Sequence, residues 1–399
     1  MMRRVYFHEW ASLSHAGDNE GYRRALFADS RLPLGTVRLV SGELAPFGSV
    51  DESLIFSEAD ILARFPNLSA DPLLRWGRGN RMAATLFGSL KSSLTRMIEA
   101  YGADRVALVI GTSVAGMTET EAFFLGGKRD ERFRDTDLEM YNPVRALRAL
   151  SGIKGPAYAI STACSSSTKA LIAAARLIKS GAVDAALCGG MDAKSLFTLS
   201  GFHALSALSL KPTQPFGEHR EGINLGEGGA LFLLSREPSE YELAGWGETS
   251  DAYHISSPDP EAHAVKAAVS HALKMADVSS VDYVCAHGTG TVKNDEMEAS
   301  VIHDLAPNAW VSSPKAITGH TLGGAGALCV AAALIGLREK RLPAHLIDDT
   351  PDPRLAKIKL ALQSVSMPTL NTVLCNSFAF GGNNAVLLIK RVAHATDKP

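Results

Sequence analysis

The sequence lacks any close pair of cysteines. Its 399 residues include five cysteines, and neighbouring ones lie at least 24 positions apart: Cys164, Cys188, Cys285, Cys329 and Cys375. Without a CxxC pair, neither a zinc site nor a dithiol redox motif is expected, so no metal is predicted. An odd number of widely spaced cysteines also gives no disulfide framework, and we expect a reduced, cytoplasmic protein.

The chain also lacks an excess of charge of one sign and a long hydrophobic run. Its 40 basic and 42 acidic side chains leave a formal net charge of −2, which is not the footprint of a nucleic-acid binder. The longest apolar stretch, residues 321–337, contains several glycines and is about one turn short of a membrane span. The basic start of the chain is interrupted by His8 and Glu9, so no signal peptide is predicted. We therefore expect no nucleic-acid partner and no membrane span.

What the sequence does contain is an alternation of strand-like and helix-like segments. The hydrophobic share of 46% and the charged share of 21% are ordinary for a globular protein. Strand-like apolar runs lie at residues 105–111, 183–190, 229–234, 281–287, 372–377 and 385–389. Segments rich in Ala and Leu, typical of helices, lie at residues 167–179, 263–276 and 324–338. This alternation predicts an α/β fold with largely parallel sheets.

A weak internal repeat runs through the chain. GlyGluGlyGlyAlaLeuPheLeuLeu (226–234) resembles GlyGlyAsnAsnAlaValLeuLeuIle (381–389) at an offset of 155. The small-residue turn and helix around Cys164 match those around His320 at nearly the same offset. Two pairs that share an offset indicate duplication. We therefore predict two halves, residues 1–240 with a nucleophile and residues 241–399 with two histidines.

Cys164 lies where a short strand-like stretch passes through small residues into a helix, within AlaTyrAlaIleSerThrAlaCysSerSerSerThrLysAla (157–170). Such a turn would present the thiol at a helix N-terminus, where free N–H groups and the macrodipole stabilise a thiolate. The same N–H groups could form an oxyanion hole. The alternative is a small buried hydrophobic side chain, which we expect for the other four cysteines. The turn favours Cys164 as a nucleophile.

Two histidines could serve the same site. His287 directly follows a strand-like run, and the carboxyl ends of parallel strands commonly carry catalytic groups. His320 stands in the second half where Cys164 stands in the first, so pseudo-twofold symmetry would bring both helix starts into one cavity. A cysteine with two histidines suits acyl transfer with enolate stabilisation. Since a helix-terminus thiolate needs little help from a base, we expect both histidines to serve decarboxylation and condensation rather than acylation.

Together these segments resemble the β-ketoacyl-acyl-carrier-protein synthases of the thiolase superfamily. The resemblance runs from about residue 70 to the C-terminus. It rests on four motifs in order: SerThrAlaCysSerSerSer (161–167), HisGlyThrGlyThr (287–291), LysAlaIleThrGlyHis (315–320) and AsnSerPheAlaPheGlyGlyAsnAsn (376–384). The Cys-His-His set resembles elongating enzymes. The short, atypical form of the chain is similar to ketosynthases of bacterial aryl-polyene clusters.

The resemblance implies a five-layered α-β-α-β-α thiolase-like fold with duplicated halves. It implies a 3-oxoacyl-[acyl-carrier-protein] synthase, in which malonyl-carrier protein is condensed, with decarboxylation, onto an acyl chain held on Cys164. The pathway would be fatty-acid or polyene/polyketide biosynthesis. No cofactor is implied beyond the phosphopantetheine that arrives on the carrier protein. The implied partners are an acyl carrier protein and a second subunit, in a homodimer or in a heterodimer with a ketosynthase-like chain-length factor.

Site roles also follow from the resemblance. His287 and His320 would stabilise the enolate, and Lys315 matches the family's lysine near the second histidine. Contacts with the substrate are implied for Thr289 and Thr291 (the pantetheine arm), Ser256 (the same arm), Phe380 (a gatekeeper whose N–H, with that of Cys164, forms the oxyanion hole) and Val114 (the floor of the acyl pocket).

Some positions depart from the family. Cys329 stands nine residues after His320, where relatives generally carry a glutamate that partners the lysine. Asp295 and Glu298 are the candidates to neutralise Lys315 instead. Ala379 replaces the glycine that usually precedes the gatekeeper, which would reduce the flexibility of that loop.

Two other classes of protein compete with this interpretation. A non-catalytic chain-length partner of a ketosynthase typically lacks the cysteine, so Cys164 with both histidines argues against it. A thiolase acting on coenzyme A substrates uses a second cysteine near the C-terminus. Cys375 precedes AsnSerPheAlaPheGlyGly rather than lying in a CysGlyGly-type loop, which argues against a thiolase.

Overall fold

The computed structural model describes residues 3–392 apart from 67, 69–70, 72 and 126–134. The main elements of the first half are β1 (Tyr6–Leu13), α1 (Asn19–Leu26), β2 (Gly35–Arg38), β3 (Leu44–Gly48), α2 (Glu58–Arg64), α3 (Arg78–Tyr101), β4 (Val106–Gly111), α4 (Met117–Leu125), α5 (Asn142–Ser151), β5 (Ala157–Ile160), α6 (Ser166–Ser180), β6 (Ala185–Asp192), α7 (Leu196–Ala204), β7 (Leu225–Gly226) and β8 (Gly228–Ser235). Those of the second half are β9 (Tyr241–Ser250), α8 (His263–Met275), β10 (Tyr283–Cys285), α9 (Val292–Leu305), β11 (Trp310–Ser312), α10 (Lys315–Thr318), α11 (Ala325–Glu339), β12 (Arg341–Leu342), β13 (Lys359–Leu360), β14 (Val365–Ser366), β15 (Thr372–Ala379) and β16 (Asn383–Arg391).

The largest sheet shows the duplication directly. Its strand order is β13-β11-β10-β15-β16-β9-β1-β8-β6-β4-β5, so the five strands β5-β4-β6-β8-β1 are mirrored by β11-β10-β15-β16-β9. β4 runs parallel to β5 and β6, just as β10 runs parallel to β11 and β15. The two groups of five strands meet only where β1 pairs with β9 over two residues. The predicted internal duplication is therefore confirmed.

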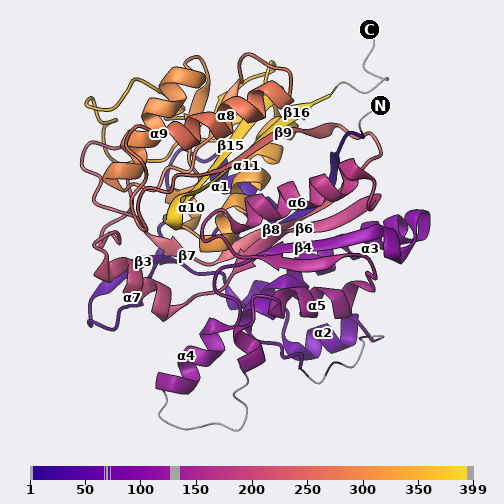
Figure 1. Ribbon diagram of the computed structural model, residues 1–399. Coiled ribbons are helices and arrows are strands. Elements are labelled where there is room, and N and C mark those ends of the chain that lie inside the picture. Colours follow the sequence, from indigo (N-terminus) through magenta and orange to yellow (C-terminus); the bar gives the residue numbers. More distant parts are fainter. Residues whose placement is uncertain (1–2, 67, 69–70, 72, 126–134, 393–399) are drawn as a thin grey trace.

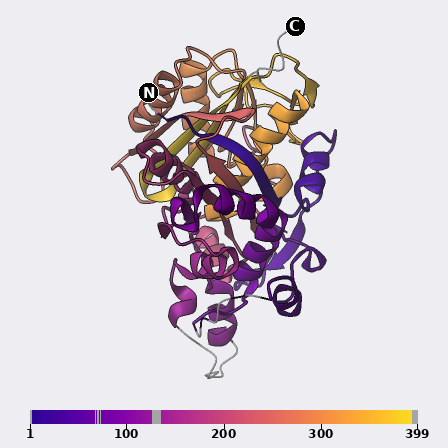
Figure 2. The same ribbon diagram turned by 90° about the vertical axis from the view of Figure 1, so that its right-hand side faces the viewer.

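The expectation of largely parallel sheets is wrong for β1, β8, β9 and β16, which pair only antiparallel in the described part of the large sheet. β8 pairs antiparallel with β1 and β6, and β16 pairs antiparallel with β9 and β15. β15 and β16 are joined by the short turn Phe380–Gly382, and so short a connection can only return the chain in the opposite direction. Figure 2 shows β1 running between the two halves.

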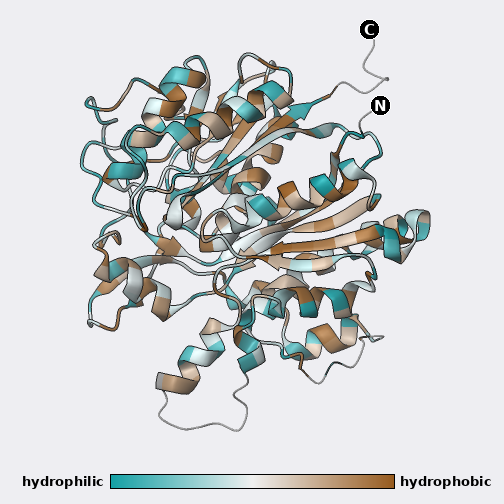
Figure 3. Ribbon diagram, viewed as in Figure 1, coloured by the Kyte–Doolittle hydropathy of each residue, from teal (hydrophilic) through white to brown (hydrophobic). Residues whose placement is uncertain are grey.

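The layers follow from which faces are apolar. α3 and α5 cover the outer face of the first group of strands, and α8 and α9 cover the outer face of the second (Figure 1). α6 and α11 lie between the two groups, within the largest apolar cluster of the described residues. The strands and α11 are accordingly the most hydrophobic parts of the ribbon (Figure 3). The five-layered α-β-α-β-α architecture is confirmed.

The helix α11 is buried on every side. All residues from Ala325 to Leu337 are buried, because the helix packs on α6, β8, β10 and β15. By length and composition alone the stretch Leu322–Glu339 could cross a membrane, and 89% of that stretch is buried inside the protein. A central helix of a layered core needs this composition without any contact with lipid.

Candidate active site

The chain makes a sharp turn at Cys164, as the small residues predict. β5 ends at Ile160 and α6 begins at Ser166, and between them Ala163 adopts φ = +52°, a left-handed conformation that is uncommon outside glycine. Gly111, at the end of β4, lies against this helix start, since a Cβ on it would lie 2.3 Å from the backbone nitrogen of Ser167. The turn leaves Cys164 6% exposed, just before the first residue of α6.

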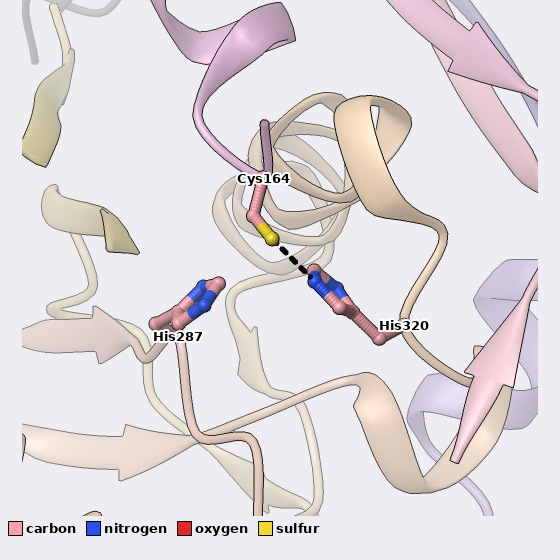
Figure 4. A group of neighbouring side chains, drawn as sticks. All are labelled: Cys164, His287 and His320. Carbon is pink, nitrogen blue, oxygen red and sulfur yellow. Dashed lines mark hydrogen bonds between the residues drawn. The ribbon is translucent and has the colours of Figure 1, made fainter. Parts of the chain in front are cut away.

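The structure brings the cysteine and both histidines together (Figure 4). Nε2 of His320 lies 2.8 Å from Sγ of Cys164. The rings of His287 and His320 pack edge to face, with their centroids 5.5 Å apart. His287 follows β10, and His320 lies in the turn between α10 and α11, so all three side chains come from the ends of secondary-structure elements. The arrangement is a thiol with two imidazoles in one buried space.

Electrostatics favour a neutral thiol and a neutral imidazole in the resting site. Burial raises the pKa of Cys164 to about 11, although Lys315 and the backbone N–H groups of Cys164 and Phe380 act in the opposite direction. Burial, reinforced by the charge of Lys315, lowers the pKa of His320 and of His287 well below the usual value. The sequence-based expectation of a stable thiolate is wrong, because burial outweighs the helix end. The thiol therefore needs a base, and His320 is placed to be that base.

Lys315 orients His287. Its amine donates to the backbone carbonyl of His287 and lies 3.4 Å from Nδ1 of the same residue. A donor at Nδ1 leaves the ring proton on Nε2. Burial lowers the pKa of Lys315. Cys329 occupies the position expected for a glutamate, and its thiol is directed at the carbonyl of Cys285 at 3.2 Å.

The two carboxylates proposed to neutralise Lys315 are both hydrogen-bonded to the loop after β10. Glu298 accepts the backbone N–H groups of His287 and Gly288 at 2.8 and 2.7 Å. Asp295 accepts the N–H of Thr289 at 3.1 Å, and burial raises its pKa to about 6. Among the described residues neither lies within ion-pair distance of Lys315, but the charge of Glu298 still acts on the lysine and raises its pKa against the effect of burial. Both carboxylates also hold the loop that carries His287.

A cavity of about 290 Å³ opens onto these residues. It is lined by Cys164, His287 and His320 together with four of the five predicted substrate contacts, Thr289, Thr291, Ser256 and Phe380. The hydroxyls of Thr289 and Thr291 are hydrogen-bonded to each other at 2.8 Å. Both residues line the same cavity as the thiol, so their hydroxyls can contact the polar arm of a substrate that reaches it.

Val114, the fifth predicted contact, does not line the cavity. It is 1% exposed and belongs to an apolar cluster behind the cavity, together with Leu199, Leu225 and Leu322. Ile223 belongs to both, because it lines the cavity and packs in the cluster. Val114 therefore belongs to an apolar cluster that reaches the cavity at Ile223, while its own side chain does not line that space.

Sequence reasoning missed an aromatic pair at the cavity. Phe202, from α7, stacks on Phe380 with ring centroids 5.3 Å apart and an angle of 18° between the rings. Both rings line the cavity. No spacing or motif in the sequence connects two phenylalanines 178 positions apart, so only the fold reveals the pair.

The same three residues could in principle meet a metal ion. Sγ of Cys164 and one ring nitrogen each of His287 and His320 lie within 4.8 Å of one another. The amine of Lys315 already lies beside the other nitrogen of His287, and a cation would have to approach this amine. The sequence-based expectation of no metal stays a prediction.

Comparison with known proteins agrees with this geometry. Residues 93–239 match the N-terminal domain of β-ketoacyl synthases, and residues 241–347 match their C-terminal domain. The chain belongs to the β-ketoacyl synthase family. It is 32% identical over 321 residues to 3-oxoacyl-[acyl-carrier-protein] synthase 2 of Synechocystis sp., covering 74% of this chain and 77% of the relative. The namesake enzyme of Coxiella burnetii is 32% identical over 327 residues, with the same coverage.

Solved structures show the same β-ketoacyl synthase fold. A chain of the complex between the ketosynthase ApeO and its chain length factor ApeC from Xenorhabdus doucetiae has a TM-score of 0.87 and 32% identity, with 98% of both chains covered. The ishigamide ketosynthase/chain length factor has a TM-score of 0.82 at 24% identity, which supports the fold alone. As a member of this family the protein is a carbon-carbon bond-forming acyltransferase.

Proposed function

We propose that this β-ketoacyl synthase takes an acyl chain from a carrier-protein thioester onto Cys164 and elongates it with a malonyl unit. The observation that carries the proposal is the 2.8 Å contact between Nε2 of His320 and Sγ of Cys164, with His287 beside them. A non-catalytic chain-length factor would not need a thiol paired with a buried base. We also propose a cytoplasmic location, which suits the five free, buried cysteines.

The first half-reaction, acylation of Cys164, follows from the pairing of its neutral thiol with the neutral imidazole of His320. As Sγ of Cys164 attacks the thioester carbonyl, its proton passes to Nε2 of His320. The negative oxygen that develops would be held by the backbone N–H groups of Cys164 and Phe380, which already direct their positive ends toward the sulfur. The carbon-sulfur bond to the carrier then breaks, and the departing pantetheine sulfur takes the proton from His320. The acyl chain is left on Cys164.

The second half-reaction requires hydrogen-bond donors. The carbon-carbon bond to the malonyl carboxylate breaks, carbon dioxide leaves, and its electron pair forms an enolate whose oxygen needs N–H groups. His287 carries its proton on Nε2 because Lys315 lies at Nδ1. Nδ1 of His320 has no hydrogen-bond partner among the described residues, so this ring can carry its proton on either nitrogen. His320 can therefore accept from the thiol first and donate to the enolate later. The enolate carbon then attacks the Cys164 thioester, the carbon-sulfur bond breaks, and the departing sulfur takes a proton that solvent supplies through His320, which restores the neutral thiol.

The partners follow from the substrate. The carrier protein would bring its own phosphopantetheine, whose polar arm meets Thr289 and Thr291, so no further cofactor is proposed. A second subunit would add at β5, the edge strand of the sheet, which pairs on one side with β4. The carbonyls of Pro156 and Ile160 face β4, so Ala159 presents its N–H outward. The ketosynthase ApeO is itself complexed with a chain length factor, which supports a heterodimer or a homodimer here.

Intact-mass measurement tests the proposal. The protein is mixed with acyl-carrier protein and malonyl-carrier protein, alone and together with candidate chain-length-factor partners. An active synthase gains the mass of the acyl group and then yields a β-ketoacyl-carrier product two carbons longer. Cys164→Ala is the matched control. Absence of both the acyl-enzyme and the product under all pairings would exclude the proposed function. Ala159→Pro should shift the sedimentation of the assembly towards the monomer.

A further inference from the structure

Asp192 is a buried carboxylate that the reaction described above does not use. It ends β6 and is 2% exposed. Oδ1 accepts the N–H groups of Ser113 and Val114 at 3.0 and 3.1 Å, together with the hydroxyl of Thr112. Oδ2 accepts the hydroxyl of Ser113 and the N–H of Gly323, both at 2.7 Å. Burial raises the pKa of Asp192, and these hydrogen bonds act in the opposite direction by favouring the ionised carboxylate.

These donors come from both halves of the molecule. Residues 112–114 form the loop after β4, in the first half, and Gly323 lies three residues after His320, in the second. The backbone turns sharply there, since Leu322 adopts φ = +51°. A Cβ on Gly323 would lie 2.7 Å from Oδ2 of Asp192, so this close approach requires glycine. The carboxylate thus joins the loop of Val114 to the turn that carries His320.

The same end of β6 also touches the helix of the nucleophile. A Cβ on Gly190, two residues before Asp192, would lie 2.8 Å from the Cβ of Ser167 in α6. The negative charge of Asp192 is close enough to act on the thiol of Cys164. Asp192 therefore lies between three parts of the site: the loop of residues 112–114, the turn that carries His320, and the start of α6 after Cys164. The distances between these parts set how the reacting groups face one another.

We propose that Asp192 is a positioning residue for the condensation: its hydrogen bonds to the 112–114 loop and to Gly323 fix His320 against Cys164. The proposal rests on the proposed function, because it assigns Asp192 a part in that reaction. Asparagine cannot replace the carboxylate, since its amide nitrogen would face N–H groups on one side. Loss of the hydrogen bond between Gly323 and Asp192 allows the turn that carries His320 to move relative to the thiol of Cys164. A displacement of about 1 Å can lower the rate about 100-fold.

The test compares Asp192→Asn with Asp282→Asn. Asp282 also accepts two backbone N–H groups and a hydroxyl, from Asn371 and Thr372, but it lies before β10, at the opposite end of that strand from His287. We expect Asp192→Asn to fold and to lose about 100-fold in condensation, while Asp282→Asn keeps its rate. The measurement is condensation rate, with circular dichroism and thermal melting as the check of folding.

A second readout tests whether the charge of Asp192 acts on the thiol of Cys164. The charged or titratable groups facing the thiol of Cys164 are Lys315, His287, His320 and Asp192. Removing the one negative charge favours the thiolate, so iodoacetamide should alkylate Cys164 several-fold faster at pH 8 in Asp192→Asn. Unfolding the site would also expose the thiol and speed its alkylation, so the faster alkylation counts only in a variant whose circular dichroism and thermal melting match those of the wild type.

Three results would overturn the assignment. They are a wild-type condensation rate in folded Asp192→Asn, an equal loss in Asp282→Asn, or an unchanged alkylation rate at pH 8. If Asp192→Asn does not fold, Ser113→Ala decides, because it removes the hydroxyl that bonds both Asp192 and Gly323, and a normal condensation rate there counts against the proposal. Alkylation of Cys164 by iodoacetamide needs no carrier protein. A wild-type protein whose thiol is alkylated but which never condenses its substrates would therefore contradict the proposed function and not the assignment of Asp192.

Discussion

Nε2 of His320 and Sγ of Cys164 are hydrogen-bonded at 2.8 Å across 156 residues of sequence. Each side chain stands at the start of a central helix, Cys164 before α6 and His320 before α11, and the two helices pack against each other between the two groups of strands. Duplication thus placed a nucleophile in one copy and a base in the other at equivalent positions. The following predictions test what that pairing does.

Cys164→Ala should abolish acyl transfer and condensation, because among the described residues the His320 ring is hydrogen-bonded to no thiol or hydroxyl other than that of Cys164. Decarboxylation of malonyl-carrier protein should persist, since both histidines remain. The measurements are acyl-enzyme mass and release of carbon dioxide. Normal condensation by this variant would remove Cys164 from the mechanism.

The two histidines should differ. His320→Ala should slow acylation of Cys164 by about 100-fold or more, because a thiol with a raised pKa loses its base. His287→Ala should leave acylation nearly unchanged and cut decarboxylation by about 100- to 1000-fold, as expected for an enolate donor. Rapid-quench acylation and carbon dioxide release separate the two steps. Equal loss of both steps in both variants would contradict this division of roles.

Alkylation of Cys164 should report its protonation. The thiolate is the reactive form, and the pKa is raised to about 11. The rate of labelling by iodoacetamide should therefore rise about tenfold per pH unit from pH 7 to 10, with no plateau in that range. Cys164→Ala gives the background from the four other cysteines. A plateau already reached at pH 7 would show a resting thiolate.

Cys329→Glu should return an ionised partner to Lys315. Burial lowers the pKa of this lysine, so condensation in the wild type should decline as the pH rises through that lowered value. An opposite charge nearby favours the protonated amine and should move the decline upward by about one to three pH units. Cys188→Ala, at a buried cysteine in β6, is the control. The measurement is the condensation rate as a function of pH. If the decline at high pH occurs at the same pH in a folded Cys329→Glu variant as in the wild type, position 329 does not act on Lys315.

Val114→Phe should shorten the longest acyl chain accepted by several carbons. Val114 packs in the apolar cluster that reaches the cavity at Ile223, so a larger ring in this cluster would take up space into which a long acyl chain must extend. The wild type should accept medium-to-long or extended unsaturated chains. A series of acyl-carrier proteins of increasing length measures the limit, with Val114→Ile as the milder variant, since one methylene is worth about 0.8 kcal/mol. The same chain-length profile in both variants and the wild type would mean that the bound acyl chain does not extend towards Val114.

The sequence by itself determined the secondary structure and the identity of the reacting groups. Apolar runs, small-residue turns and the 155-residue offset are local or repeated signals, so the strands, the central helices, the duplication and the trio of Cys164, His287 and His320 could all be predicted. Cys329 could also be recognised as a departure, because a position counted from a motif needs no structure.

Only the tertiary structure decided how these groups interact. The pKa of Cys164 depends on burial, which sums over every layer of the fold and outweighs the local effect of the helix start. Three further features also result from distant segments meeting: the antiparallel direction of β8 and β16, the stack of Phe202 on Phe380, and the packing of Val114 in one cluster with Ile223. The ties of Asp192 to Ser113 and Gly323 span 79 and 131 residues, and no local pattern encodes contacts at such separations.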